Sequence, residues 1–241
     1  QWSAWLTAKG RTIAVFQLLR LDEERIVLLL ADGDADAIAS QLQRFVFRRK
    51  VRIELRNDLA VVASFTAPEA ASGAAIAQLA GENLELDLGS DALPRSLRIG
   101  PADAVAAAAD SADITLAWRQ SDLRYGLPRL DADQREQWTP QQLGLDRLNG
   151  YSVKKGCYPG QEIVARTHFL GKAKRALQLL RVVEGTTSGT QVHQNAAAIG
   201  TVASVAGELA LAVLPLEIAP EPLSVGGVEA AHLPLLDGLA R

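Results

Sequence analysis

The chain has 241 residues, of which 48% are hydrophobic and 22% charged, and its formal net charge is −3. This composition is that of an ordinary folded protein and excludes disordered, collagen-like and coiled-coil chains. The single cysteine cannot form an intramolecular disulfide, and it cannot supply the ligands of a structural zinc ion or an iron–sulfur cluster. The chain therefore cannot hold a cluster alone, and we expect no metal site in it.

No apolar run approaches the ~20 residues that span a membrane, and residues 1–20 lack the order of a secretory signal. We therefore expect a cytoplasmic protein without direct membrane contact. We also expect a monomer. The sequence begins at Gln1 and contains no methionine, so we expect that sequence before Gln1 is missing. The length allows one large domain or two to three small ones.

The first part of the sequence alternates between short strands and helices. Apolar runs separated by turn residues predict hairpins, and Asp34 is placed to cap a helix whose buried stripe reaches Phe45 and Val46. Pro68 opens an alanine-rich run that predicts a second helix. Helices packed on a mostly antiparallel sheet, an α+β fold, are therefore expected. The expected elements are strands at 13–21 and 25–30, a helix at 34–46, strands at 51–55 and 60–65, a helix at 68–81 and a strand that ends at 88.

The second part begins with an alanine-rich helix predicted at 101–112 and an alternating strand predicted at 114–118. A capping box predicts a short helix at 139–148. Residues 177–241 consist of apolar runs separated by Gly, Pro, Asn and Ser, which predicts a small all-β module, barrel-like in form. Because residues 184–237 carry acids but no Lys or Arg, this module is not expected to bind nucleic acid.

Cys157 lies in the run KKGCYPGQE, residues 154–162. Two glycines and a proline oppose regular structure here and predict a loop that exposes the thiol. The lysines just before it would favour the thiolate, the form in which cysteine acts as a nucleophile or redox group. The alternative is a small buried apolar side chain, and the basic, glycine-rich setting favours the functional interpretation.

On a helix that starts near Gly160, Glu162 and Arg166 would form an i,i+4 pair. The residues alone favour a surface ion pair, although a carboxylate beside the Gln161 amide could also hydrogen-bond a planar heterocycle. Trp118 is either a core residue or a stacking surface for a flat ligand. Residue type and position alone favour the core.

Two other patterns are weaker. A cysteine–histidine hydrolase or a metal site would require His168, His193 or His232 beside Cys157, which spacing alone cannot show. The basic run at 44–56 could meet RNA or another polyanion. A solvated helix end is favoured there, and the net negative charge argues against direct nucleic-acid binding.

The run KGCYPGQE at 155–162, with Arg166 four residues further on, resembles the signature of the YgfZ family. These are folate-binding proteins linked to iron–sulfur cluster assembly and tRNA modification, related to the T-protein aminomethyltransferases of glycine cleavage. Residues 8–11 resemble the family's AKG(R/K) turn, 45–51 resemble its FVFRSKV segment, and 200–202 fall in its C-terminal barrel. The resemblance covers most of the chain.

This resemblance implies three small domains in a ring around a channel that binds tetrahydrofolate. The implied folate-binding domain is discontinuous, covering 1–23 and 99–171, with its N-terminal part missing. A ferredoxin-like domain at 24–98 is inserted into it, and a β-barrel at 172–241 follows.

The resemblance also implies a site, with Cys157 and Lys155 as its catalytic residues. Trp118 corresponds to a folate-contacting tryptophan, because a Gly-Leu-Pro segment follows it. A second such tryptophan of the family lies upstream of Gln1, so neither Trp2 nor Trp5 replaces it. The residues implied to bind tetrahydrofolate or a one-carbon derivative are Trp118, Tyr158, Gln161, Glu162 and Arg166.

Two functions follow from the resemblance. The first is a folate-binding accessory protein that uses Cys157 in assembling or repairing iron–sulfur clusters, with cluster-containing client enzymes or assembly proteins as partners, tRNA-modifying enzymes among them. The alternative is a folate-dependent aminomethyltransferase of the T-protein type. T-proteins lack the cysteine of the signature, which favours the first function. Whether any reaction is catalysed stays open.

Overall fold

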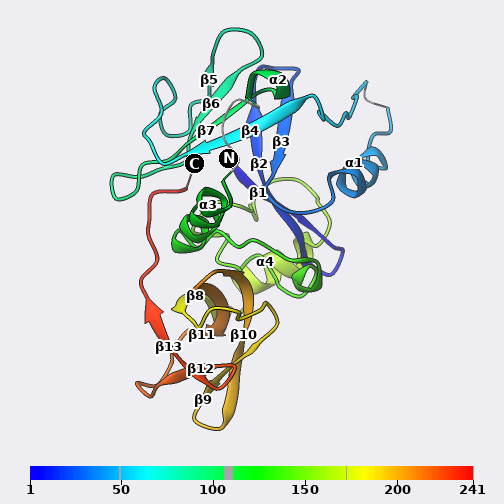
Figure 1. Cartoon of the computed structure of the whole chain (residues 1–241). Helices are drawn as coiled ribbons and strands as arrows, with labels where there is room; N and C mark the ends of the chain where they lie inside the picture. Colours follow the sequence, from blue (N-terminus) through cyan, green and yellow to red (C-terminus); the bar gives the residue numbers. More distant parts are fainter. Residues whose placement is uncertain (49, 106–110, 172, 241) are drawn as a thin grey trace. The chain divides into compact units, whose positions relative to one another are not determined.

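The computed structural model describes residues 1–48, 50–105, 111–171 and 173–240. The chain divides into two compact units (Figure 1). One unit combines Gln1–Ala31 with Asp110–Arg241, and the other is the single segment Asp32–Ala109. The second unit therefore interrupts the first in sequence. The finer division into three domains stays a prediction.

The first unit opens with three strands, β1 (Trp2–Leu6), β2 (Thr12–Arg20) and β3 (Ile26–Leu30). They form an antiparallel sheet in which β2 is central. The hairpin predicted at 13–21 and 25–30 is confirmed. Strand β1 was not predicted, although its two buried apolar residues, Trp2 and Leu6, mark it in the sequence.

The same unit ends in a closed six-stranded barrel with the strand order β10-β11-β8-β13-β12-β9, drawn in yellow to red in Figure 1. This confirms the β-barrel predicted from 177 onward. Its strands are β8 (Arg175–Arg181), β9 (Gln191–Gln194), β10 (Ala197–Ala206), β11 (Leu209–Pro215), β12 (Leu223–Val225) and β13 (Val228–Leu233). Alternate strand residues fill the interior with small and branched apolar side chains. These include Leu180, Val192, Val202, Ala210, Ala212, Leu214 and Val225.

Between the sheet and the barrel in sequence lie α3 (Ala112–Arg124), the 3-10 helix η1 (Ala132–Gln134) and α4 (Gln161–Phe169). The strand predicted at 114–118 is wrong, because this segment is part of α3. The Ser111 hydroxyl caps α3 by accepting from the Ile114 amide at 3.4 Å. The apolar alternation did not mark a buried face, since Ile114 is 49% exposed.

The helix predicted at 139–148 is also wrong. Its capping box is present: Thr139 Oγ1 accepts from the Gln142 amide at 3.2 Å, and Gln142 Oε1 accepts from the Thr139 amide at 3.0 Å. After these bonds the chain forms successive turns up to Asn149. Gly144 at φ 61° interrupts any regular helix there.

The second unit contains a four-stranded antiparallel sheet of order β4-β7-β6-β5. The elements are α1 (Ala35–Gln43), β4 (Leu59–Ser64), β5 (Ala77–Gln78), β6 (Leu84–Asp87), β7 (Ser96–Pro101) and α2 (Ala102–Val105). The Asp34 side chain caps α1 by accepting from the Ala37 amide at 3.0 Å, as predicted. Of the helix predicted at 101–112, α2 covers the start and 106–110 lie outside the described residues.

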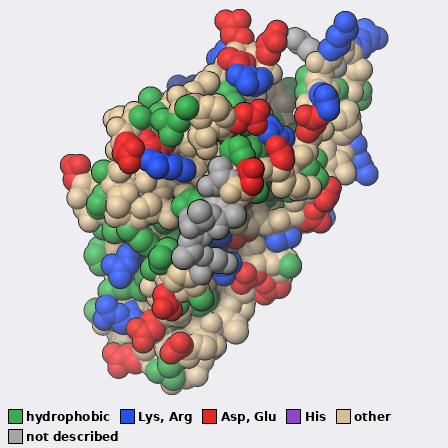
Figure 2. Space-filling model, turned by 45° about the horizontal axis from the view of Figure 1, so that its top comes forward, with side chains coloured by type: hydrophobic (Ala, Val, Ile, Leu, Met, Phe, Trp, Pro, Cys, Tyr) green, Lys and Arg blue, Asp and Glu red, His purple; other side chains and the backbone are tan. Residues whose placement is uncertain are grey.

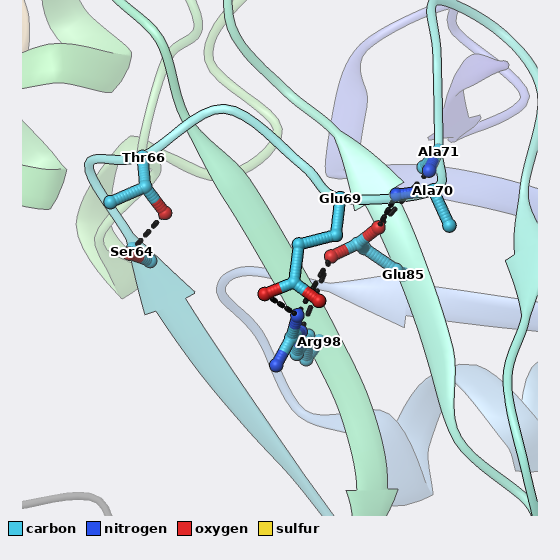
Figure 3. A network of polar contacts seen from close by, with 7 residues as sticks. All are labelled: Ser64, Thr66, Glu69, Ala70, Ala71, Glu85 and Arg98. Carbon is cyan, nitrogen blue, oxygen red and sulfur yellow. Dashed lines mark hydrogen bonds and ion pairs between the residues drawn. The ribbon is translucent and has the colours of Figure 1, made fainter.

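Three predictions for this unit are wrong. The helix predicted at 68–81 is absent, and side chains of β6 bind the backbone there instead. Glu85 accepts from the Ala70 and Ala71 amides (Figure 3). Asp87 accepts from the Gly73 amide. Residues 51–55 form no strand, since β4 pairs with β7 instead. The stripe predicted on α1 does not reach Phe45, which lies beyond the helix and is 55% exposed.

The chain thus combines helices with mostly antiparallel sheets and a barrel, as the predicted α+β class requires. Among the residues that the structure describes, no helix is both long and apolar enough to cross a membrane. The ferredoxin-like character of the middle segment stays a prediction.

Candidate functional site

The candidate site is centred on the loop that leads into α4. Cys157 is exposed there, as are Lys154, Lys155 and Gly156 before it. The loop ends at Gly160, which has φ 78° and precedes the first residue of α4. The sequence-based prediction of an exposed thiol in an irregular loop is therefore confirmed.

The turn between β1 and β2 supports the end of this loop. It is closed by hydrogen bonds between Thr7 and Arg11, with the Thr7 amide donating to the Arg11 carbonyl at 2.8 Å. Gly10, at φ 68°, lies against Gly160 and against the Ile163 side chain on α4. The structure thus brings together two segments, 8–11 and 155–162, that carry the family resemblance.

Side chains within the loop bind its own backbone. The Tyr158 hydroxyl donates to the Ser152 carbonyl at 2.8 Å, and Gln161 Nε2 donates to the Lys155 carbonyl at 3.1 Å. The Lys155 ammonium lies over the Tyr158 ring, 4.9 Å from its centroid. Burial raises the pKa of Tyr158, so its hydroxyl stays a donor. Ser152, which the sequence analysis did not single out, is therefore part of the site.

The other predicted site residues lie on two helices. Glu162 and Arg166 are exposed on α4, and Trp118 is half-buried on α3. The helix predicted from Gly160 is confirmed. Both side chains are open to solvent, and the structure shows no ion pair between Glu162 and Arg166, which are both described residues.

A cavity of about 300 Å³ lies at the other end of α4, between that helix and the barrel. Its lining includes Gln141, Asp146, Tyr151, His168 and Arg175. Burial, with the nearby Asp146 charge, raises the pKa of Tyr151 to about 12. None of the residues predicted to bind folate lines this cavity.

The three histidines lie on different elements, and in the described part of the chain none of them forms a metal-binding group with Cys157. Across the described ranges, no group of three or more His, Cys, Asp or Glu side chains is arranged to hold a metal ion. His168 lies in the last turn of α4 and packs edge-on against Phe169, with ring centroids 4.9 Å apart. His193 and His232 lie on barrel strands β9 and β13.

The basic run at 44–56 follows α1, and its described residues, 44–48 and 50–56, are largely exposed. Part of its charge is balanced locally, because Arg52 pairs with Glu54 and Arg56 pairs with both Asp58 and Glu82. Figure 2 shows basic and acidic side chains interspersed over the face that it draws. This mixture is typical of a solvated surface.

No protein-family model matches the chain. Two curated proteins, both named tRNA-modifying protein YgfZ, are similar to it. The one from Colwellia psychrerythraea is 28% identical over 185 residues, which are 70% of this chain and 56% of that protein. The one from Aliivibrio fischeri is 38% identical over 112 residues, which are 42% of this chain and 35% of that protein. These relatives confirm the resemblance to YgfZ proteins, and the matches span about half and about a third of their lengths.

Among solved structures, the aminomethyltransferase T of the glycine cleavage system from Bartonella henselae superposes with a TM-score of 0.72. The match covers 98% of this chain and 75% of that one, at 18% sequence identity. The chain therefore has an aminomethyltransferase-like fold, and at this identity the similarity concerns the fold alone.

Proposed function

We propose that this chain is a folate-binding accessory protein that acts with Cys157 in assembling or repairing iron–sulfur clusters on client enzymes, including enzymes that modify tRNA. The observation that carries the proposal is the exposed thiol of Cys157 in a KGCYPGQE loop. Similarity to proteins named tRNA-modifying protein YgfZ supports it. A lone exposed thiol can contact a cluster or a cysteine of another protein, which suits a factor that holds no cluster of its own.

The proposed folate contacts fit tetrahydrofolate chemically. The Trp118 indole offers a flat apolar face to a pteridine ring. The Glu162 carboxylate can accept from ring N–H groups, and the Arg166 guanidinium can bind the carboxylates of the glutamate tail. These side chains are half-buried or exposed. Tetrahydrofolate would supply one-carbon chemistry when bound, while the protein residues bind and orient it.

The chain would form three domains in this proposal. The first covers 1–23 and 99–171, a ferredoxin-like domain covers 24–98, and the third covers 172–241. We also propose that the protein is a monomer in the cytoplasm and acts together with its client enzymes. Aminomethyl transfer is the second candidate, favoured by the superposition on an aminomethyltransferase. Turnover with glycine-cleavage carrier protein would favour this second candidate over the first.

Two substitutions test the main proposal. Trp118→Ala should weaken tetrahydrofolate binding at least tenfold in a calorimetric titration, and Trp118→Phe, which retains a ring, should weaken it less.

Cys157→Ser should leave the tetrahydrofolate affinity and the melting temperature unchanged, because the side chain is exposed. In cells that lack their own YgfZ protein, Cys157→Ser should fail to restore methylthiolated tRNA nucleosides. Restoration at the parent level would exclude a role for the thiol.

A further inference from the structure

Two side-chain hydrogen bonds bridge the candidate loop, and Cys157 lies inside both bridges. The first runs from the Tyr158 hydroxyl to the Ser152 carbonyl at 2.8 Å. The second runs from Gln161 Nε2 to the Lys155 carbonyl at 3.1 Å. The first bond encloses residues 152–158 and the second encloses residues 155–161. The segment from Lys155 to Tyr158 lies within both, so it is held from both sides.

The backbone itself supplies little of this order. From 151 to 157, within the part of the chain that the structure describes, no backbone amide or carbonyl joins another backbone group by a hydrogen bond. One further bond is local, from the Lys154 amide to Ser152 Oγ at 3.2 Å. The conformation around Cys157 therefore depends on side chains, chiefly those of Tyr158 and Gln161.

The Tyr158 ring adds a third contact, since it lies under the Lys155 ammonium at 4.9 Å. A cation over an aromatic face is attracted by the ring quadrupole. The same side chain thus holds the loop backbone through its hydroxyl and the lysine through its ring. Lys155 is exposed, and this contact keeps its ammonium over the Tyr158 ring.

We propose that Tyr158 and Gln161 are positioning residues that hold Cys157 and Lys155 in place, and that they do not contact the folate. The part played by Cys157 rests on the proposed function above. The tyrosine hydroxyl has a single hydrogen, which the Ser152 carbonyl takes. A ligand that drew this hydrogen away, or the one Gln161 Nε2 hydrogen that the Lys155 carbonyl accepts, would open the loop. Holding a reactive group in one geometry before its partner arrives lowers the entropy lost in the encounter.

The test compares amide hydrogen exchange in the folate-free protein with tetrahydrofolate affinity. Tyr158→Phe removes only the hydroxyl, and Gln161→Met removes the amide at nearly constant size. Two amides of the loop are hydrogen-bonded, that of residue 154 to Ser152 Oγ and that of residue 161 to the Tyr158 carbonyl. Each substitution should speed exchange of these two amides about fivefold, as expected for the loss of one neutral hydrogen bond. Tetrahydrofolate affinity should stay within twofold of the parent. Gln161→Lys, whose ammonium can again donate to the Lys155 carbonyl, should restore slow exchange.

Matched controls delete the same groups elsewhere. Tyr151→Phe removes a hydroxyl from a half-buried tyrosine outside the two bridges. Gln178→Met removes a bond from an amide to the Pro215 carbonyl, 2.7 Å long, in the barrel. Neither should change exchange in the loop.

The readouts separate the possible outcomes. Unchanged loop exchange together with affinity weakened tenfold would overturn the inference and make Tyr158 and Gln161 ligand contacts. A parent protein that binds no tetrahydrofolate would overturn the proposed function alone, because exchange in the ligand-free protein still decides the positioning role. If both proposals hold, Tyr158→Phe should lower restoration of the client enzyme while affinity and melting temperature stay at the parent values.

Discussion

The backbones of Gly10 and Gly160 touch. A Cβ atom on Gly160 would lie 2.6 Å from the Gly10 Cα and 2.6 Å from the Thr7 carbonyl oxygen. Both glycines also have positive φ, 68° and 78°, a region that residues with a Cβ seldom adopt. The contact joins the β1–β2 turn to the start of α4, and so fixes the end of the loop that carries Cys157.

Gly160→Ala should therefore destabilise the unit that contains the loop. The added methyl group meets backbone atoms, which cannot move aside as a flexible side chain would, and the positive φ adds strain. We expect a loss of about 1–3 kcal/mol in the free energy of unfolding. Denaturant titration followed by circular dichroism measures this directly.

Gly156→Ala is the matched control, in the same loop. Nothing lies within 4 Å of the Cβ that this substitution adds. Its effect should stay within about 0.5 kcal/mol. Equal losses for the two variants would show that the contact between Gly10 and Gly160 is not what limits the loop.

The sequence was sufficient where local chemistry decides the structure. Asp34 caps its helix, the strand-and-turn pattern after 177 forms a barrel, and glycines with a proline expose Cys157. Prediction failed where a distant partner decides. In the alanine-rich run after Pro68, three backbone amides donate to carboxylates on β6, and no helix forms there.

In the candidate site too, local features were predicted from the sequence and contacts between distant segments were not. The run of residues around Cys157 identified the loop and its exposure. The contact between Gly10 and Gly160 joins segments far apart in sequence, which spacing along one chain does not reveal. The bond between Tyr158 and the nearby Ser152 carbonyl was not predicted for another reason, because a tyrosine suited to a flat ligand is equally suited to a backbone acceptor.

A second stability prediction concerns Ser204 on barrel strand β10. Its hydroxyl accepts from the Arg129 amide at 2.9 Å and donates to the Arg129 carbonyl at 2.8 Å. Ser204 is fully buried, so water cannot replace these bonds without a rearrangement. Ser204→Ala should cost about 1–3 kcal/mol of the free energy of unfolding, because two hydrogen bonds to the half-buried Arg129 backbone are lost.

Ser224→Ala tests whether this cost comes from the reciprocal bonds or from the loss of any barrel hydroxyl. Ser224 is half-buried on β12, and its substitution should change stability by less than about 0.5 kcal/mol. Both variants are compared with the parent by denaturant titration. A Ser204→Ala effect no larger than that of Ser224→Ala would mean that the barrel and Arg129 are held together by other contacts.

The last prediction concerns Glu85 on β6, which is 1% exposed and lies at the centre of the network in Figure 3. Its carboxylate accepts from the Ala70 amide at 2.7 Å and the Ala71 amide at 3.0 Å. The Arg98 guanidinium donates to it at 3.2 Å. Burial by itself raises the pKa of Glu85, but these donors and the Glu69 amide outweigh it and lower the pKa to about 2, from 4.5.

A carboxyl group whose pKa is lower in the folded than in the unfolded state stabilises the fold above the unfolded value. The contribution of Glu85 should therefore be complete above pH 4.5 and lost as the pH falls towards 2. Glu85→Gln should be less stable than the parent at pH 7, by about 1–3 kcal/mol, since an amide oxygen is a weaker acceptor and its NH₂ group faces donors. The difference should shrink through this pH window, because protonation takes the same charge from the parent.

Thermal unfolding of the parent and of Glu85→Gln at a series of pH values from 7 to 2 measures this difference. Asp58 is the useful comparison in the same unit, because Arg56 lowers its pKa at an exposed position. Solvent screens that pair, so Asp58→Asn should change the pH dependence far less. A gap between parent and Glu85→Gln that stays constant with pH would mean that the donors hold the loop equally well without the charge.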